Sequence, residues 1–166
     1  SSSARKMAIT NYNLNVLDED HIAQLKDESF NVITMWHVLE HVHLLSDRLK
    51  QINRIISKDG LLVIAVPNYT SYDAKHYREK WAAYDLPRHL YHFSPKTMNQ
   101  LLTQNGFQLV KTLPMKFDSF YVSMLSEKYK NGKGNILKAF FNGFVSNLKA
   151  WSDVKKCSSV IYVISK

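Results

Sequence analysis

Two largely apolar stretches on either side of an amphipathic segment constrain the fold of this chain most strongly. The stretches "FNVITM" (30–35) and "LLVIAVP" (61–67) are the β-branched runs typical of strands buried in a parallel sheet. Between them, "LSDRLKQINRIIS" (45–57) predicts a helix with one apolar face, formed by Leu49, Ile52, Ile55 and Ile56. A strand, a helix and a second strand in this order predict a β-α-β unit.

The flanking segments continue the same alternation. We expect helices over 4–13 and 94–104, and strands over 14–17, 107–114 and 158–166. Ser46 and Ser94 are good N-cap residues for the helices that follow them, and Asn105-Gly106 supplies a left-handed stop. The fold class is therefore α/β, a doubly wound parallel sheet covered by helices on both faces.

Composition places the chain among single-domain globular proteins. It has 166 residues, of which 45% are hydrophobic, and no apolar run is long enough to span a bilayer. Its one cysteine, Cys157, cannot form an internal disulfide, which fits a reducing cytoplasm. We therefore expect a single cytoplasmic domain over 1–166.

The formal charge of +8 is concentrated at the C-terminal end. Residues 111–166 contain ten lysines and no arginine, against three acids, Asp118, Glu127 and Asp153. Proteins that read nucleic acid more often use arginine for forked contacts with phosphate and guanine. The lysine bias makes a nucleic-acid partner unexpected.

An inserted segment over 117–151 separates the last two expected strands. In its second half, large apolar residues recur every three or four positions, with polar residues opposite. The apolar set is Leu137, Phe141, Phe144, Leu148 and Trp151, and the polar set is Lys138, Asn142, Asn147 and Lys149. A basic amphipathic helix of this kind packs against its own domain or a second subunit as a homodimer, or contacts a membrane peripherally through 135–151.

Three polar loops follow expected strands. Because the carboxyl ends of parallel strands share one edge of a sheet, we expect 18–20, 36–41 and 67–73 to converge. Within "WHVLEH", the residues His37, Glu40 and His41 have the i, i+3, i+4 spacing of one helical face. Imidazole and carboxylate groups at this place could bind a divalent metal, or a His could accept a proton from a substrate. Alternatively, Glu40 and His41 are structural and hold the helix to the "PRH" loop by hydrogen bonds. We expect no metal, with these three residues as the candidate ligands if one binds.

The order "SFNVI", "LEH", "SKDG", "PN" and "PRHLYHFSPKTMNQLLTQNGF" resembles class I S-adenosylmethionine-dependent methyltransferases over residues 1–113. The branch with the ubiquinone-biosynthesis O-methyltransferases and many bacterial relatives is the most similar. Asn31 stands where that branch usually has Asp, and its usual "LKPGG" turn has lost a Pro and a Gly here.

The resemblance implies a Rossmann-like, mostly parallel sheet with a C-terminal antiparallel strand, and S-adenosylmethionine as cofactor. It implies that Asp18 or Glu19 accepts a hydrogen bond from the adenine amino group, and that Trp36 and His37 line the methionine end. Trp36 is otherwise a core residue. The stretch "DLPRHLYHFS" (85–94) would cover a small-molecule acceptor, through Arg88, His89, Tyr91 and His92. Some relatives hold a divalent ion with an E-x-x-E-H motif. Residues 37–41 of this chain are similar to that motif, with His37 in place of the first glutamate.

The family's glycine-rich cofactor loop is absent, so the resemblance implies that the chain begins about one β-α-β unit late and is inactive alone. The expected activity is methyl transfer, O-methylation favoured, to a small-molecule or lipid-like acceptor. His37, Glu40 and His41 are then the candidate catalytic residues. The alternative is a non-catalytic module of this fold that binds a partner.

Overall fold

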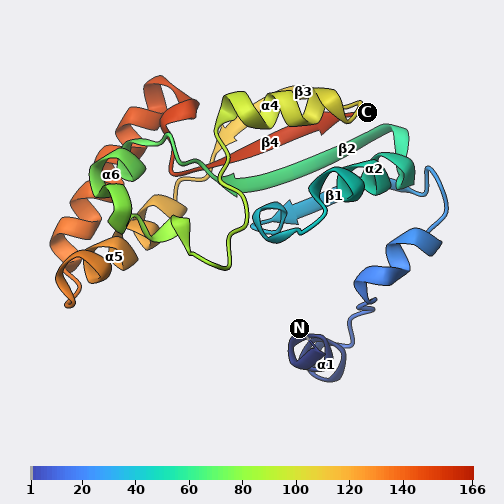
Figure 1. Cartoon of the computed structure of the whole chain (residues 1–166), viewed down its shortest axis with the longest axis horizontal. Helices are drawn as coiled ribbons and strands as arrows, with labels where there is room; N and C mark the ends of the chain where they lie inside the picture. Colours follow the sequence, from blue (N-terminus) through green and yellow to red (C-terminus); the bar gives the residue numbers. More distant parts are fainter. Residues whose placement is uncertain (1) are drawn as a thin grey trace.

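A computed structural model describes residues 2–166, and a four-stranded mixed sheet forms its centre (Figure 1). The strands are β1 (Phe30–Trp36), β2 (Ile56–Pro67), β3 (Gln108–Pro114) and β4 (Ser159–Ser165), in the order β1-β2-β4-β3. β1 and β2 are parallel, and β4 runs antiparallel to both β2 and β3. The expected α/β fold, mostly parallel with a C-terminal antiparallel strand, is confirmed.

Six α-helices and five short 3-10 turns complete the described residues, and α1 stands apart from the sheet (Figure 1). The α-helices are α1 (Ser2–Tyr12), α2 (Leu45–Ile55), α3 (Tyr72–Tyr77), α4 (Pro95–Gln104), α5 (Asp118–Asn131) and α6 (Ile136–Ser152). The 3-10 turns are η1 (Glu19–Gln24), η2 (Leu39–His41), η3 (Arg78–Lys80), η4 (Ala82–Tyr84) and η5 (Val154–Lys156). None of the described helices is both long enough and apolar enough to cross a membrane.

The main core lies between one face of the sheet and the helices α2 and α4. Alternate residues of β2 and β4, including Leu62, Ile64 and Tyr162, pack there with Leu49 of α2 and Leu102 of α4. The opposite face is only partly covered, because Val32 and Trp36 of β1 are 58% and 50% exposed. At this end of the sheet the described residues therefore leave the second face partly uncovered, although helices were expected over both faces.

The α2–β2 junction differs from its predicted position. Helix α2 ends at Ile55, so Ile56 is the first residue of β2 rather than part of the apolar helical face. The ladder pairs Phe30 with Ile56 and then Val32 with Leu61, so the "SKDG" segment (57–60) forms an irregularity inside the strand. Gly60 is required there, since an added Cβ would lie 2.6 Å from Ile56 Cγ1.

The expected strand over 14–17 is absent, and residues 13–18 have no regular structure. Leu14 and Leu17 are 53% and 49% exposed. A strand is stable only when its backbone groups find a partner, and no described strand pairs with this segment.

The expected helix-capping residues are confirmed for α4 and wrong for α2. Ser94 caps α4 in a capping box with Thr97, as expected, and Gly106 has the left-handed φ of 76°. Ser46 is not a cap, because α2 begins at Leu45. The "VLEHV" segment forms only the 3-10 turn η2, not the start of an α-helix.

The inserted segment forms a hairpin of α5 and α6 beyond the carboxyl ends of β1 and β2 (Figure 1). The buried side of α6 consists of small or polar residues, namely Ala139, Asn142, Gly143, Ser146 and Ala150. Of the alternatives for the large apolar face, packing on its own domain is not what the structure has, because Phe141 and Trp151 are 65% and 86% exposed. Close helix packing explains this, because a Cβ on Gly143 would lie 2.7 Å from Phe120.

Candidate functional site

His37 occupies a sharp turn immediately after β1. Its φ of 50° is left-handed, a conformation in which His is enriched among non-glycine residues. Its backbone N–H donates to the carbonyl of Ala65 in β2 at 3.0 Å, which extends the ladder by one residue. This turn brings the His37 side chain beside Glu40, as expected. The two residues do not lie on one helical face, so that part of the prediction was wrong.

Glu40 is a buried carboxylate at the centre of the site, with 1% of its surface exposed. Its Oε1 lies 3.2 Å from Nδ1 of His37, and its backbone carbonyl accepts from the N–H groups of Leu90 and Tyr91. Its Oε2 is buried without a hydrogen-bond partner among the described residues. An ionised carboxylate only accepts hydrogen bonds, so it holds the proton of a neutral His37 on Nδ1.

The second ring nitrogen of His37 is left as an acceptor. This Nε2 is buried, has no hydrogen-bond partner among the described residues, and lies 4.0 Å from Oδ2 of Asp118. Asp118 is the first residue of α5 and is hydrogen bonded by the hydroxyl of Ser159. A cavity of about 220 Å³ adjoins these groups. It is lined by His37, Pro67, Ala82, Ala83, Asp85, Arg88, His89, Asp118, Tyr121, Val122, Leu125 and Tyr129.

Hydrogen bonds, burial and charges around the cavity shift the pKa values of its titratable groups in different directions. The hydrogen bond with Glu40 raises the pKa of His37; burial opposes this, and the charges of Asp118 and Glu40 add to it. Burial raises the pKa of Asp118, against the hydrogen bond from Ser159 and the charge of His37. Burial lowers the pKa of His89 and favours its neutral form.

The pKa of His37 is expected to fall in both Glu40→Gln and Asp118→Asn, and to fall further in Glu40→Gln. The Glu40 hydrogen bond is the largest cause of the raised pKa, whereas Asp118 acts through charge alone. A pH titration of the His37 imidazole followed by NMR measures both shifts. Asp59→Asn, an exposed site on β2, is the matched control and should leave the pKa unchanged. A larger shift in Asp118→Asn than in Glu40→Gln would contradict this ordering.

Glu40, His41 and His89 form a compact cluster beside this dyad. One potential ligand atom from each lies within 4.8 Å of the others, so the three could hold a metal ion. Nδ1 of His41 bonds the carbonyl of Arg88 at 2.9 Å, and Nδ1 of His89 bonds that of Ala83 at 2.8 Å. Each ring therefore keeps Nε2 free of these backbone bonds. The His41 bond ties η2 to the loop over 88–91, which is what the structural alternative expects, and the His89 bond ties that loop to η4.

The four predicted acceptor-binding residues divide into two pairs. Arg88 and His89 line the cavity, and the Arg88 guanidinium pairs with Asp85 at 2.7 Å. Tyr91 and His92 do not line it: the Tyr91 hydroxyl donates to the carbonyl of His43, and Nε2 of His92 bonds the carbonyl of Tyr84. Tyr91 and His92 therefore serve to anchor the loop.

The residues expected to bind a cofactor lie in different places. Asp18 pairs with Arg5 at 2.5 Å, and Glu19 pairs with Arg48. Trp36 is half exposed at the end of β1, so it is not a core residue. The structure therefore does not bring the two acids together with Trp36 through any contact among the described residues.

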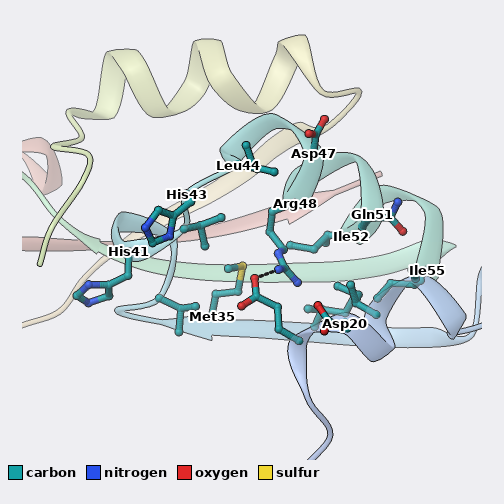
Figure 2. Close-up of a pocket in the computed structure, with 16 residues that line it drawn as sticks. Asp20, Met35, His41, His43, Leu44, Asp47, Arg48, Gln51, Ile52 and Ile55 are labelled. Atoms are coloured by element: carbon teal, nitrogen blue, oxygen red, sulfur yellow. Dashed lines mark hydrogen bonds and ion pairs between the residues drawn. The ribbon is translucent and has the colours of Figure 1, made fainter. Parts of the chain in front are cut away.

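Glu19 lines a second, larger groove of about 760 Å³ between η1, β1 and α2. Met35 and Ile52 contribute to its apolar wall, Arg48 extends across it, and His41 lies at one end (Figure 2). The groove thus connects the N-terminal segment with the His41 side of η2. Of the three loops expected to converge, 36–41 and 67–73 meet through His37 and Pro67 at the smaller cavity. Loops 18–20 and 36–41 meet at the larger groove, which Asp20 and Val38 both line.

Four polar residues that line the smaller cavity were not predicted as site residues, namely Asp85, Asp118, Tyr121 and Tyr129. Asp85 carried a weak signal, its i, i+3 spacing from Arg88. The other three lie on α5, in the inserted segment, whose position over the strand ends no local pattern encodes. A tertiary contact alone places them.

Comparison with known proteins gives a consistent result. A family model described as a methyltransferase domain matches residues 2–112. A SAM-dependent methyltransferase from Archaeoglobus fulgidus aligns with a TM-score of 0.59 at 18% identity, over 96% of this chain and 71% of that one. Another from Thermotoga maritima gives 0.53 at 20% identity, over 86% of this chain and 58% of that one.

The cyclase SpnF has the same fold, with a TM-score of 0.56 at 12% identity, over 99% of this chain and 60% of that one. The chain thus spans less than two thirds of the length of two of these three proteins. No curated protein matches its sequence. Since SpnF is named for a cyclisation, this fold by itself does not determine the reaction.

Proposed function

Because the chain belongs to the family of methyltransferase domains, we propose that it transfers a methyl group from S-adenosylmethionine to a hydroxyl oxygen of an acceptor. The observation that carries this proposal is the pair formed by His37 and Glu40. Nε2 of His37 is buried, unpartnered among the described residues and beside the cavity, while Glu40 holds the opposite nitrogen at 3.2 Å. Such a dyad is suited to accept one proton from a hydroxyl group.

The described residues fit one wall of a donor site. Trp36 presents a half-exposed ring at the carboxyl end of β1, and His37 follows it, so these two would hold the methionine end. Asp18 and Glu19 fit less well as adenine ligands, because each already pairs with an arginine. When bound, the sulfonium supplies an activated methyl group, which leaves positioning and proton removal to the protein.

His37 performs the proton step in this proposal. Nε2 would take the hydroxyl proton of the acceptor as the acceptor oxygen receives the methyl group, and S-adenosylhomocysteine would be the leaving group. The resulting imidazolium lies between the carboxylates of Glu40 and Asp118, at 3.2 and 4.0 Å. Both negative charges favour the protonated ring, which is the charge that develops during transfer.

Cavity size and lining indicate the acceptor. A volume of about 220 Å³ is small, below the roughly 300 Å³ at which ligand pockets usually begin. It admits a small molecule, or the reacting end of a larger, lipid-like one. The rings of Tyr121 and Tyr129 and the guanidinium of Arg88 suit a flat acceptor that carries polar substituents.

The test is donor binding followed by an acceptor screen with the full-length protein. Calorimetric titration with S-adenosylmethionine is expected to show binding, and labelled methyl groups should appear on oxygen in small hydroxylated acceptors. Transfer only to nitrogen or carbon would contradict the O-methylation. Absence of donor binding would favour the partner-binding module instead.

A further inference from the structure

The outer side of α6 carries a continuous row of large apolar side chains. We call it the α6 apolar face; it consists of Leu137, Phe140, Phe141, Phe144, Leu148 and Trp151. Exposure reaches 84% at Leu137 and 86% at Trp151. At helical periodicity these six positions fall within an arc of about 100°, so they form a single stripe. Soluble monomers rarely expose an apolar patch of this kind without a partner for it.

Rotation of α6 cannot bury this face against its own domain. The opposite side is occupied by the contact with α5, where Gly143 approaches Phe120 so closely that a Cβ would lie 2.7 Å away. Asn142 donates to the hydroxyl of Tyr77, and Ser146 donates to Asp73. These contacts fix which side of α6 faces inward, so the apolar stripe needs a partner from outside the described chain.

The charges around the face identify the kind of partner. Exposed lysines occur before, along and after α6, namely Lys130, Lys133, Lys138, Lys149, Lys155 and Lys156. The acids in this part of the chain are Asp118, Glu127 and Asp153, of which the first two are 12% and 2% exposed. The side chain of Asp153 is 40% exposed and lies 4.0 Å from Lys156. The surface next to the apolar stripe is therefore almost purely cationic.

We propose that the α6 apolar face docks peripherally on an anionic lipid bilayer. The aromatic and leucine side chains enter the boundary between headgroups and acyl chains, and the lysines contact the anionic headgroups. A second copy of the chain suits the face less well, because an isologous contact would bring the two lysine sets together. This docking does not depend on methyl transfer, so either can fail alone.

The test is co-sedimentation with vesicles. The chain is expected to bind vesicles of phosphatidylglycerol and phosphatidylcholine at low salt, to bind phosphatidylcholine alone at least about tenfold more weakly, and to dissociate as salt rises. Phe141→Ser/Trp151→Ser should reduce binding by about tenfold or more, since it removes two of the largest apolar groups of the face. Lys138→Glu/Lys149→Glu should reduce binding to a similar extent.

Matched variants keep these comparisons specific. Tyr12→Ser/Leu44→Ser removes two apolar groups that are 70% and 69% exposed elsewhere, and should leave binding unchanged. Lys58→Glu/Lys96→Glu is the control for Lys138→Glu/Lys149→Glu, because it makes the same charge change at exposed sites on β2 and α4. Equal binding to both kinds of vesicle, or none to either, overturns the proposal. So does a dimer in light scattering that Phe141→Ser/Trp151→Ser dissociates, which would assign the face to a second copy.

Discussion

Replacing His37 with Asn is expected to slow methyl transfer by about a hundredfold or more, the usual contribution of a positioned general base. Asn tolerates the left-handed φ of 50° at this position. Its amide can still donate to Glu40 from near the place of Nδ1, so the buried carboxylate keeps a partner. What the substitution removes is Nε2, the one atom that the proposed step requires. Methyl transfer to the best acceptor of the screen, measured under single-turnover conditions, reads the chemical step directly.

The pH profile provides a second readout of the same residue. A base must be neutral to accept a proton, and the pKa of His37 is raised from its ordinary value of 6.5. The rate should therefore rise with pH through a value above 6.5, and this limb should be absent in His37→Asn. The contribution of His37 to the free energy of unfolding has the opposite pH dependence. It is fully present below pH 6.5, where the ring is protonated in both states, and it is lost as pH rises through the raised pKa of the folded protein.

His76→Gln is the matched control, because His76 is exposed on α3 and outside the cavity. It should keep both the rate and the pH limb. A His37→Asn variant of full activity would contradict the base assignment. Activity that is lost with chelators, restored by Zn²⁺ or Mn²⁺ and abolished in His89→Asn would instead assign Glu40, His41 and His89 to a metal.

Replacing Asp73 with Ala is expected to reduce the free energy of unfolding by about 3 kcal/mol or more, because it removes the shared acceptor of three buried donors. The indole N–H of Trp81 and the hydroxyl of Ser158 donate to Oδ2 at 2.8 and 2.7 Å, and the hydroxyl of Ser146 donates to Oδ1 at 3.0 Å. Asp73 is fully buried in α3, so water cannot replace it at the surface. These bonds join α3, α6 and the loop before β4.

Urea unfolding followed by circular dichroism measures this loss. Ser146→Ala removes one donor and its bond, and should cost about 1 kcal/mol. Asp59→Ala, on the exposed part of β2, controls for loss of a carboxylate and should change stability by less than about 0.5 kcal/mol. An Asp73→Ala variant as stable as the Asp59→Ala control would show that the network contributes nothing net.

Much of the sheet was predictable because its strands carry their own signal. The runs that became β1, β4 and the second half of β2 are largely apolar and β-branched, and such runs pair wherever a sheet offers them a buried place. The capping box of Ser94 and the left-handed Gly106 are equally local, since each depends on a few neighbouring residues. The segment over 14–17 had a similar apolar pattern and failed, because pairing also needs a neighbouring strand.

The site was predictable only in part for the same reason. His37 and Glu40 are close in sequence, so their contact survived even though a left-handed turn and a 3-10 turn replaced the expected helix. His89 reached Glu40 only because backbone bonds join the loop over 88–91 to η2. Asp118 had no sequence signal at all, and the folding of α5 over the strand ends placed it beside His37.

The sequence alone therefore determined the order of the four strands β1 to β4, the lysine excess near α6, and the "LEH" segment as a marker of the strand end. Only the tertiary structure decided which side of α6 is buried. Periodicity finds an apolar stripe but does not reveal that small residues on the other side allow a closer helix contact. It likewise decided that Nε2 of His37 is buried beside Asp118 at the edge of a cavity, because that arrangement requires three segments that are distant in sequence to meet.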